Sequence, residues 1–346
     1  MRVFVYEFVT GGGFLHDDKL LSPSLLNEGT AMLAALATDF SRLPQCSVTV
    51  LRDHRISLDI ADCTIHAVAA ADEERNMISR IAQECDWTVV IAPEFNGFLL
   101  DRVELATSAG GRLLGPSAET IALAANKSLL AKQFSRADVP TPNGCTIDRG
   151  ATVPDNFTFP AVLKQLDGAG SLNVQLVRNK AAARKIGAID FDGRLERFID
   201  GTPVSVSVLC GPNGNRPLPA CRQHLSGNGQ FTYAGGSLPL PDDLTAEAQR
   251  LAIAAVQALP DPLGYIGVDV VLGNPTGEAC VIEVNPRLTT SYVGLRAACR
   301  QNLATAMIAV ALGQSTELSF RPDGIGFDTC GNTWIDSTSQ RDASRE

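Results

Sequence analysis

The first third of the chain alternates short apolar runs with segments that have the 3.6-residue period of a helix. Strands are predicted at residues 3–8, 48–51 and 87–92, and helices at residues 25–40 and 73–84. Strands that alternate with helices form a parallel sheet covered by helices, so this part is expected to be an α/β domain.

The pattern changes after residue 137, where a helix predicted at 118–137 ends before Pro140 and Pro142. Short β-rich runs follow at 162–164, 174–177 and 204–209, and their alternation predicts an antiparallel sheet with one solvated face. A third block contains a helix near 246–259, strands at 265–272 and 279–284 joined by a turn at 273–277, and a helix near 295–312. The last eleven residues, 336–346, are almost wholly polar and are expected to fray.

Composition narrows the class of protein. Lys and Arg number 29 against 38 Asp and Glu, and 45% of residues are hydrophobic, as in an ordinary globular protein. The net charge of −9 and the absence of a basic cluster argue against nucleic acid as a partner. Nine scattered cysteines without a Cys-x-x-Cys pair indicate free thiols in a reducing cytoplasm. An apolar start without a basic leader, and no apolar run longer than 304–312, argue against a signal peptide and a membrane span.

The segment with the clearest chemistry is a predicted hairpin that carries oxygen ligands. Glu283 and Asn285 lie two residues apart and therefore share a strand face, and Asp269 on the paired strand can face them. Two carboxylates and an amide oxygen on one buried face suit Mg²⁺ held jointly with phosphates. Arg287, two residues further on, would lie on the same side as a phosphate clamp. The alternative is a buried acid pair satisfied by Arg287 alone.

Two lysines precede this hairpin. Lys164 lies on a predicted strand that leads into the glycine-rich segment 167–171, which includes Gly168, Gly170 and Ser171. Such a loop lets backbone N–H groups approach phosphate oxygens, and the lysine adds a point charge. Lys127 lies early in the helix predicted at 118–137 and could reach an anion. Each lysine alone is a weak signal.

In this order, the pieces resemble the ATP-grasp superfamily. Its pattern comprises a lysine before a helix, a strand lysine with a glycine-rich flap, a Glu-x-x-Ile-x-Gly linker, and paired acid strands ending in Glu-x-Asn-x-Arg. The matching residues are Lys127, Lys164 with 167–171, Glu196 to Gly201, and Asp269 with Glu283, Asn285 and Arg287. The resemblance covers about residues 115–313.

The resemblance implies an ATP-grasp fold, α/β and α+β, with an N-terminal parallel-sheet (pre-ATP-grasp) domain. It implies domains at 1–116, 117–199 (small lobe) and 200–335 (large lobe with the metal site), and a tail at 336–346. ATP would bind with its adenine against Glu196, Arg197 and Ile199 and its phosphates on the two lysines and the glycine-rich loop. Asp269, Glu283 and Asn285 would hold Mg²⁺ or Mn²⁺.

The sequence departs from D-alanine ligase-like members at two positions. Pro203 stands where a glutamate binds the ribose, so the group that holds the ribose is unassigned. Gly267 stands where an arginine precedes the first metal acid. If any arginine stabilises the phosphoryl group, it must be Arg222 or Arg287, which we therefore take, with Lys164, as the catalytic candidates.

A narrower resemblance covers nearly the whole chain, to the tyramine–glutamate ligase group of ATP-grasp enzymes. Its marks are the segments 5–13, 24–33, 91–94, 222–223, 233–236 and 285–292. The group joins glutamate to tyramine or a related amine on the way to methanofuran-type one-carbon cofactors. The reaction implied proceeds through an acyl phosphate, which the amine converts to an amide.

Several residues are candidates for substrate binding. Glu7 and Glu94 each follow a predicted parallel strand, where ligands of such sheets bind, and either could hold an ammonium group. Glu28, in the first helical region, is a weaker candidate. Thr290 and Ser291 precede the last helix and could bind a carboxylate, or simply cap the helix. Gln223, beside Arg222, could contact the glutamate or the acyl phosphate.

Three functions remain open at this point. The first is the carboxylate–amine ligase, acting on small-molecule carboxylate and amine substrates. The second is a D-alanine ligase-like enzyme that joins two amino acids. The third is an ATP-binding regulatory protein without turnover, which the complete acid set with Arg287 disfavours. A homodimer is left open.

Overall fold

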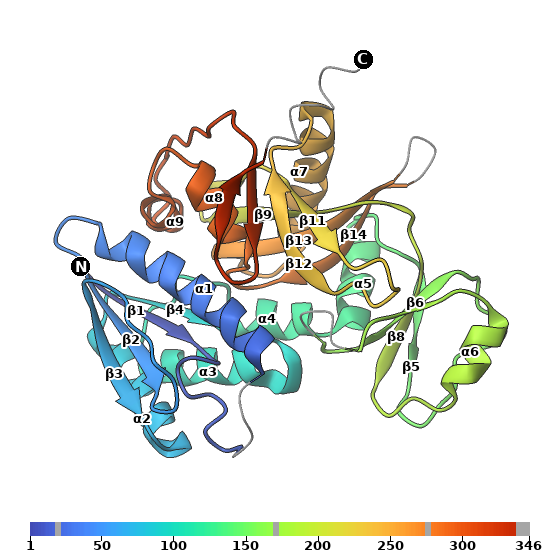
Figure 1. The fold of residues 1–346 in the computed structure, drawn as a ribbon, viewed down its shortest axis with the longest axis horizontal. Helices are drawn as coiled ribbons and strands as arrows, with labels where there is room; N and C mark the ends of the chain where they lie inside the picture. The colour runs from blue at the N-terminus through green and yellow to red at the C-terminus, as the bar shows by residue number, and fades with distance from the viewer. Residues whose placement is uncertain (18–21, 169–172, 274–277, 337–346) are drawn as a thin grey trace.

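The computed structural model describes residues 1–17, 22–168, 173–273 and 278–336, and it places their strands in three sheets (Figure 1). Gly170, Ser171, most of the predicted 273–277 turn and nearly all of the predicted tail lie outside the described residues. The predicted fold class is confirmed, since a parallel sheet precedes two antiparallel ones. The domain boundaries at 116, 199 and 335 stay predictions.

The N-terminal sheet has four parallel strands in the order β3-β2-β1-β4. Its strands are β1 (Arg2–Glu7), β2 (Ser47–Asp53), β3 (Cys63–Val68) and β4 (Trp87–Ile91). Its helices are α1 (Pro23–Ser41), α2 (Ala71–Glu84), the 3₁₀ turn η1 (Phe95–Gly97) and α3 (Phe98–Ser108). Val3 and Val5 pack with α1 residues, whereas Phe4 packs with residues of α2 and α3. Successive residues of β1 therefore pack on opposite faces of the sheet, and helices cover both faces.

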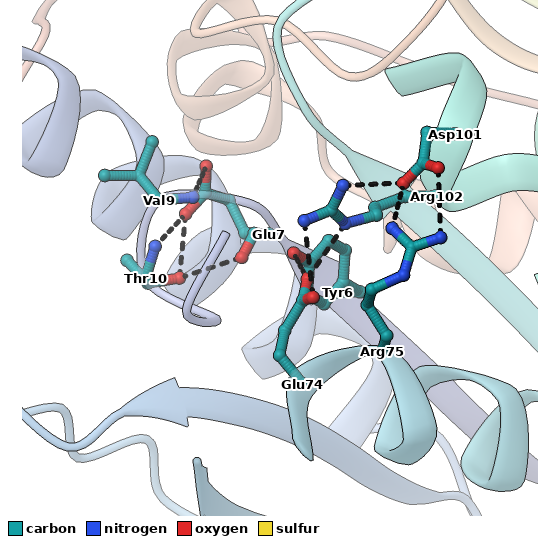
Figure 2. Close-up of polar contacts among 8 residues, drawn as sticks. All are labelled: Tyr6, Glu7, Val9, Thr10, Glu74, Arg75, Asp101 and Arg102. Atoms are coloured by element: carbon teal, nitrogen blue, oxygen red, sulfur yellow. Dashed lines mark hydrogen bonds and ion pairs between the residues drawn. The ribbon is translucent and has the colours of Figure 1, made fainter. Parts of the chain in front are cut away.

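Figure 2 shows this alternation at the end of β1, where Tyr6 and Glu7 point to opposite sides. The Tyr6 hydroxyl donates a hydrogen bond to Glu74 on α2, and Nε of Arg102 on α3 donates to Glu74 Oε1 at 3.0 Å. Nη1 of Arg102 also donates to Asp101 Oδ2 at 2.6 Å. Burial, and then the Glu74 carboxylate, raise the pKa of Tyr6 well above its ordinary value. This network ties α2 and α3 to the sheet.

The small sheet is antiparallel, in the order β5-β8-β6-β7, and one short helix packs on it. Its elements are β5 (Gly144–Ile147), β6 (Ala161–Gln165), β7 (Gln175–Val177), β8 (Gly193–Arg197) and α6 (Lys180–Ile186). Apolar residues of alternate strand positions, such as Leu163 and Leu195, form its core with Ala183 of α6. Lys164 of β6 and Glu196 of β8 therefore lie on the opposite face of this sheet.

The prediction of a single helix at 118–137 is wrong, because the helix is interrupted at Asn126. Helix α4 (Ala118–Ala125) ends there and α5 (Lys127–Arg136) begins. The Asn126 side chain accepts hydrogen bonds from the backbone N–H groups of Ser128 and Leu129, at 3.1 and 3.0 Å. An N-cap of this kind starts a new helix and leaves the Lys127 amide free to donate to the Leu166 carbonyl at 3.1 Å.

The large sheet runs β14-β13-β9-β11-β12-β15-β16, with β10 paired to β9. Its strands are β9 (Gly201–Gly211), β10 (Gly214–Pro217), β11 (Cys221–Leu225), β12 (Tyr233–Leu238), β13 (Gly264–Gly273), β14 (Cys280–Asn285), β15 (Ile325–Asp328) and β16 (Thr333–Ile335). Residues 204–209 were expected in a half-solvated sheet with 162–164, but they lie in β9 and are buried on both faces. The helix α7 (Asp242–Gln257) covers one face and α9 (Leu303–Ala311) the other.

The helix predicted at 295–312 is also two helices, α8 (Ser291–Ala298) and α9. Asn302 caps α9 by accepting from the Thr305 amide at 3.2 Å, and its Nδ2 donates to the Asp39 carbonyl at 2.8 Å. The Asp39 carboxylate on α1 in turn accepts from Tyr292 at 2.8 Å and from Arg296 at 2.6 Å. Figure 1 shows the result, with α1 running between the N-terminal sheet and the pair α8 and α9.

Two further findings concern the whole described chain. The nine cysteines are free thiols. None of the helices in the described ranges combines the length and the apolar character needed to span a membrane.

We predict that Arg102→Ala destabilises the fold by about 3–5 kcal/mol, because it leaves the fully buried Glu74 carboxylate without its cation. Urea unfolding followed by circular dichroism measures the loss. Arg184→Ala, which removes an exposed ion pair with Asp155, is the matched control and should leave the midpoint unchanged. A loss below about 1 kcal/mol for Arg102→Ala would show that the pair is dispensable.

Candidate active site

The candidate metal ligands lie opposite each other on two strands of the large sheet. Asp269 of β13 pairs with Glu283 of β14, and Gly267 pairs with Asn285, so the three polar side chains share one face. Asn285 Nδ2 donates to Asp269 Oδ2 at 3.1 Å, and Gln223 Nε2 on β11 donates to Asp269 Oδ1 at 2.9 Å. The structure thus brings together the three residues that the hairpin pattern singled out.

The charge balance on this face favours a cation. Burial, and then the facing Glu283 carboxylate, raise the pKa of Asp269 to about 7. Two carboxylates and an amide oxygen are hard oxygen donors of the type that Mg²⁺ takes together with phosphate oxygens. Within the described ranges no three or more His, Cys, Asp or Glu side chains group as metal ligands, and the third oxygen donor of this face is the Asn285 amide. The donor set therefore fits Mg²⁺.

Lys127 stands between this face and the glycine-rich segment. Its Nζ donates to the Gly168 carbonyl at 2.5 Å and lies 3.5 Å from Glu283 Oε1. The side chain is almost wholly buried, because the cap at Asn126 turns the first residue of α5 inward. The helix break that the periodicity missed is what positions this lysine.

Lys164 lies on β6 beside Glu196 of β8, and their side chains form an ion pair of 2.7 Å. Nε of Arg194 donates to the other Glu196 oxygen at 2.9 Å. Burial alone would raise the pKa of Glu196, but the two cations outweigh it and lower that pKa. Lys164 is therefore buried and held in place. Arg194 was missed by the sequence analysis because strand alternation alone does not reveal which carboxylate it contacts.

The predicted adenine-binding segment begins at Glu196 and connects the small sheet to the large one. The Arg197 amide donates to the Asn143 carbonyl at 2.9 Å, and its side chain pairs with Glu278 at 2.6 Å. The Phe198 amide donates to the Pro160 carbonyl at 3.0 Å. Ile199 is buried at the start of the connection to β9. The amides of Arg197 and Phe198 are thus already engaged.

Arg287 forms its ion pair with Glu94, which follows β4 of the N-terminal sheet. Nε of Arg287 lies 2.9 Å from Glu94 Oε1, and Nη2 donates to Oε2 at 3.1 Å. Burial would lower the pKa of Arg287, but Glu94, Glu283 and Glu28 outweigh it and raise that pKa. The guanidinium thus faces carboxylates from both the N-terminal sheet and the large sheet.

Glu7, at the end of β1, is buried and accepts three hydrogen bonds from the turn that follows it. The donors are the Val9 amide at 3.1 Å and the Thr10 amide and hydroxyl, each at 2.7 Å (Figure 2). Burial raises its pKa and these donors oppose the rise. A Cβ on Gly29 of α1 would approach the Glu7 carboxyl carbon to 2.6 Å, so this helix position requires glycine. Glu7 is therefore tightly enclosed.

The remaining predicted site residues differ in the strand face on which they lie and in the residues that they contact. Ser291 hydrogen-bonds Ser205 of β9 at 2.8 Å, and Thr290 is buried at the start of α8 without a side-chain capping bond. Gln223 contacts Asp269, as described above. Arg222 precedes Gln223 in β11, so strand alternation places it on the opposite face of the sheet. Arg222 is therefore not brought to the face of Asp269 and Gln223.

Tyr233 of β12 was a mark of the family resemblance but not a predicted site residue. Its ring lies within reach of Ser291, and burial first, then nearby acids including Asp269 and Glu28, raise its pKa well above the ordinary value. It could not have been singled out from the sequence, because the residues around it come from α1, β13 and α8.

Two family models match the chain. A pre-ATP-grasp domain matches residues 46–121 and an ATP-grasp domain matches residues 124–291. Among curated proteins, the chain is 27% identical to the tyramine–L-glutamate ligase of Methanocaldococcus jannaschii, over 94% of this chain and 93% of that one. It is 32% identical to the D-alanine–D-alanine ligase of Paramagnetospirillum magneticum, over 47% of this chain and 57% of the relative.

Solved structures share the fold. An ATP-grasp superfamily protein from Archaeoglobus fulgidus superposes with a TM-score of 0.70 at 22% identity, covering 94% of this chain and 92% of that one. An L-amino acid ligase from Bacillus licheniformis gives 0.69 at 18% identity, covering 94% and 78%. The two matched domains agree with the acid-bearing strands and the lysines described above. The chain belongs to the ATP-grasp superfamily and is a ligase of that superfamily.

Proposed function

We propose that this ATP-grasp ligase joins glutamate to tyramine, or to a related amine, in the synthesis of a methanofuran-type one-carbon cofactor. The proposal is supported by likeness to tyramine–L-glutamate ligases over 94% of this chain, whereas the D-alanine–D-alanine ligase match covers 47% of it. The observation that carries the chemistry is the convergence of Asp269, Glu283 and Asn285 on one face, with Lys127 beside them.

The proposed reaction has two steps. A carboxylate oxygen of glutamate attacks the γ-phosphorus of ATP, and ADP leaves. The amine then attacks the acyl carbon, phosphate leaves, and the nitrogen loses a proton as the amide forms. Phosphoryl transfer of this kind depends on positioning and charge stabilisation more than on covalent help from the protein.

The residues divide this work by location. Asp269, Glu283 and Asn285 would hold the metal ion, which supplies charge neutralisation for the phosphates when bound. Lys127 and Lys164, both buried, are fixed cations for phosphate oxygens, and Gly168 lies beside Lys127. Arg287, held by Glu94, lies two residues beyond Asn285 and is placed to orient a substrate carboxylate. Thr290 and Ser291 stand nearby at the start of α8 and are kept as substrate-binding candidates.

The experiment that tests this function is ADP release with Mg²⁺ and ATP across a matrix of acids and amines, followed by mass determination of the product. We expect a product heavier than tyramine by one glutamyl residue. ADP release only with pairs of amino acids would favour the D-alanine ligase-like alternative. Tight ATP binding without any product would favour a regulatory protein.

We predict that Glu283→Gln lowers turnover roughly a hundredfold or more, because it removes charge where the metal and Lys127 meet the phosphates. Glu278→Gln, five residues earlier and exposed, is the matched control and should keep wild-type turnover. Thermal melting establishes that both variants fold. Full activity in a folded Glu283→Gln protein would contradict the metal assignment.

We also predict that Mg²⁺ binding weakens as the pH falls. The pKa of Asp269 is raised to about 7, so below that pH the metal must displace a proton from the folded protein. The apparent affinity should fall roughly tenfold between pH 8 and pH 6, with proton release at the lower pH. Calorimetric titration in buffers of different ionisation enthalpy measures both quantities. Asp269→Asn should abolish the dependence, and an unchanged slope in that variant would assign the titration elsewhere.

A further inference from the structure

The turn that follows β4 contacts residues from both of the other sheets. Glu94 in this turn forms the ion pair with Arg287, which follows β14 of the large sheet. Two residues later, the backbone amide of Asn96 donates a hydrogen bond to Asp167 Oδ2 at 3.0 Å. Asp167 follows β6 of the small sheet and begins the glycine-rich segment. The short stretch 94–96 therefore joins the N-terminal sheet to the large sheet and to the small sheet.

The backbone of this turn has an unusual conformation at the residue that contacts Asp167. Asn96 has a φ of 54° and a ψ of 18°, and Gly97 follows with a φ of 67° and a ψ of 16°, so both residues are left-handed. A left-handed residue other than glycine costs free energy, which contacts around it must offset. The rings of Phe95 and Phe98 pack edge to face on either side, with their centroids 5.5 Å apart. The turn is thus held in the conformation that directs the Asn96 amide at the small sheet.

Both carboxylate oxygens of Asp167 accept a hydrogen bond. Oδ2 accepts from the Asn96 amide, and Oδ1 accepts from Gln165 Nε2 at 2.9 Å. The Oε1 atom of Gln165 in turn accepts from Asn173 Nδ2 at 2.7 Å, and Asn173 lies two residues before β7. Hydrogen bonds to an ionised carboxylate are stronger than those between neutral groups. Asp167 is therefore fixed from the small sheet by Gln165 and from the N-terminal domain by Asn96.

The next residue, Gly168, contacts the lysine that lies beside Glu283. Its carbonyl accepts from Lys127 Nζ at 2.5 Å, and the same nitrogen lies 3.5 Å from Glu283 Oε1. The position of Asp167 therefore also sets the position of a carbonyl that holds the Lys127 charge. Together with the ion pair of Arg287, these contacts form a closed series that passes through all three sheets.

We propose that Asp167 is a positioning residue for the ligase reaction, because it anchors the start of the glycine-rich segment on the Asn96 amide. The inference rests on the proposed function, in which an acyl phosphate must wait for an amine. Water competes with that amine. Its attack on the acyl carbon breaks the bond to the phosphate oxygen, releases phosphate and restores glutamate as the water loses a proton. By keeping the Lys127 side of the site joined to the Glu94 turn, the anchor limits this loss.

We predict that Asp167→Ala uncouples ATP use from amide formation. The wild-type chain should release about one ADP for each amide, because each acyl phosphate consumes one ATP. The variant should release roughly three or more ADP for each amide, because water takes intermediates that would otherwise meet the amine. Parallel assays of ADP and of the amide, the latter by mass spectrometry, measure the ratio. A folded variant that is slower but keeps the wild-type ratio would show a merely structural role and overturn the inference.

Two further variants sharpen this test. Asp167→Asn keeps one oxygen that can accept from the Asn96 amide, so its ratio should lie between those of the wild type and Asp167→Ala. Asp148→Ala removes an exposed acid directly after β5 of the same sheet, and as the matched control it should keep the wild-type ratio. Thermal melting establishes that all three variants fold. If Asp148→Ala raises the ratio as much as Asp167→Ala does, the effect belongs to the small sheet in general and the inference is wrong.

Hydrogen exchange tests the anchor without any turnover. Because the Asn96 amide is bonded to Asp167, it should exchange slowly in the wild-type chain, and Asp167→Ala should speed its exchange about tenfold. Mass spectrometry of peptides that cover residues 93–98 measures the rate, and Asp148→Ala should leave it unchanged. Equal exchange in the wild type and in Asp167→Ala would overturn the inference.

The proposed function and this inference can fail separately. If the wild-type chain makes no amide from glutamate and tyramine, the proposed function fails, and the exchange rate of the Asn96 amide alone then decides whether Asp167 is an anchor. If the amide forms and Asp167→Ala keeps the wild-type ratio of ADP to amide, the function stands and the inference alone is lost.

Discussion

The ion pair between Arg287 and Glu94 is the contact on which the arrangement of the site depends. Arg287 follows β14, the strand of Glu283 and Asn285, by two residues, and Glu94 follows β4 of the N-terminal sheet by three. A buried charge without its partner is costly, so each residue fixes the position of the other. The contact therefore sets how the carboxyl edge of the parallel sheet meets the acid face of the large sheet.

Helix α1 supports the same junction from the side. Its Asp39 carboxylate binds Tyr292 and Arg296 of α8, and its Gly29 packs on Glu7 of β1. Helix α1 contacts the N-terminal sheet on one side and helices α8 and α9 on the other, and so links the two. The N-terminal sheet is thus tied to the part of the chain that follows β14, in keeping with a likeness to the tyramine–L-glutamate ligases that extends over nearly the whole chain.

The sequence was informative where the chemistry is local. Asp269, Glu283 and Asn285 could be placed on one face because a strand repeats every two residues and the two strands are joined by a short turn. The broken helices at Asn126 and Asn302 were missed, since the 3.6-residue period continues across a capping asparagine. Strand β3 was missed as well, because it is a short edge strand whose residues are mostly half-exposed or exposed. The partners of Lys164 and Arg287 could not be predicted, because each is brought near by the tertiary fold.

The charges of the site argue for two separate cation-seeking regions. Asp269 and Glu283 face each other with Lys127 as their nearby cation, whereas Glu7, Glu28 and Glu94 share Arg287. Each group of acids exceeds its resident cations, and in the first region the facing Glu283 carboxylate adds to burial in raising the pKa of Asp269. A metal ion that arrives with phosphate would relieve the first region. In the second region Arg287 balances part of the acidic charge, and its ion pair with Glu94 joins that region to the N-terminal sheet.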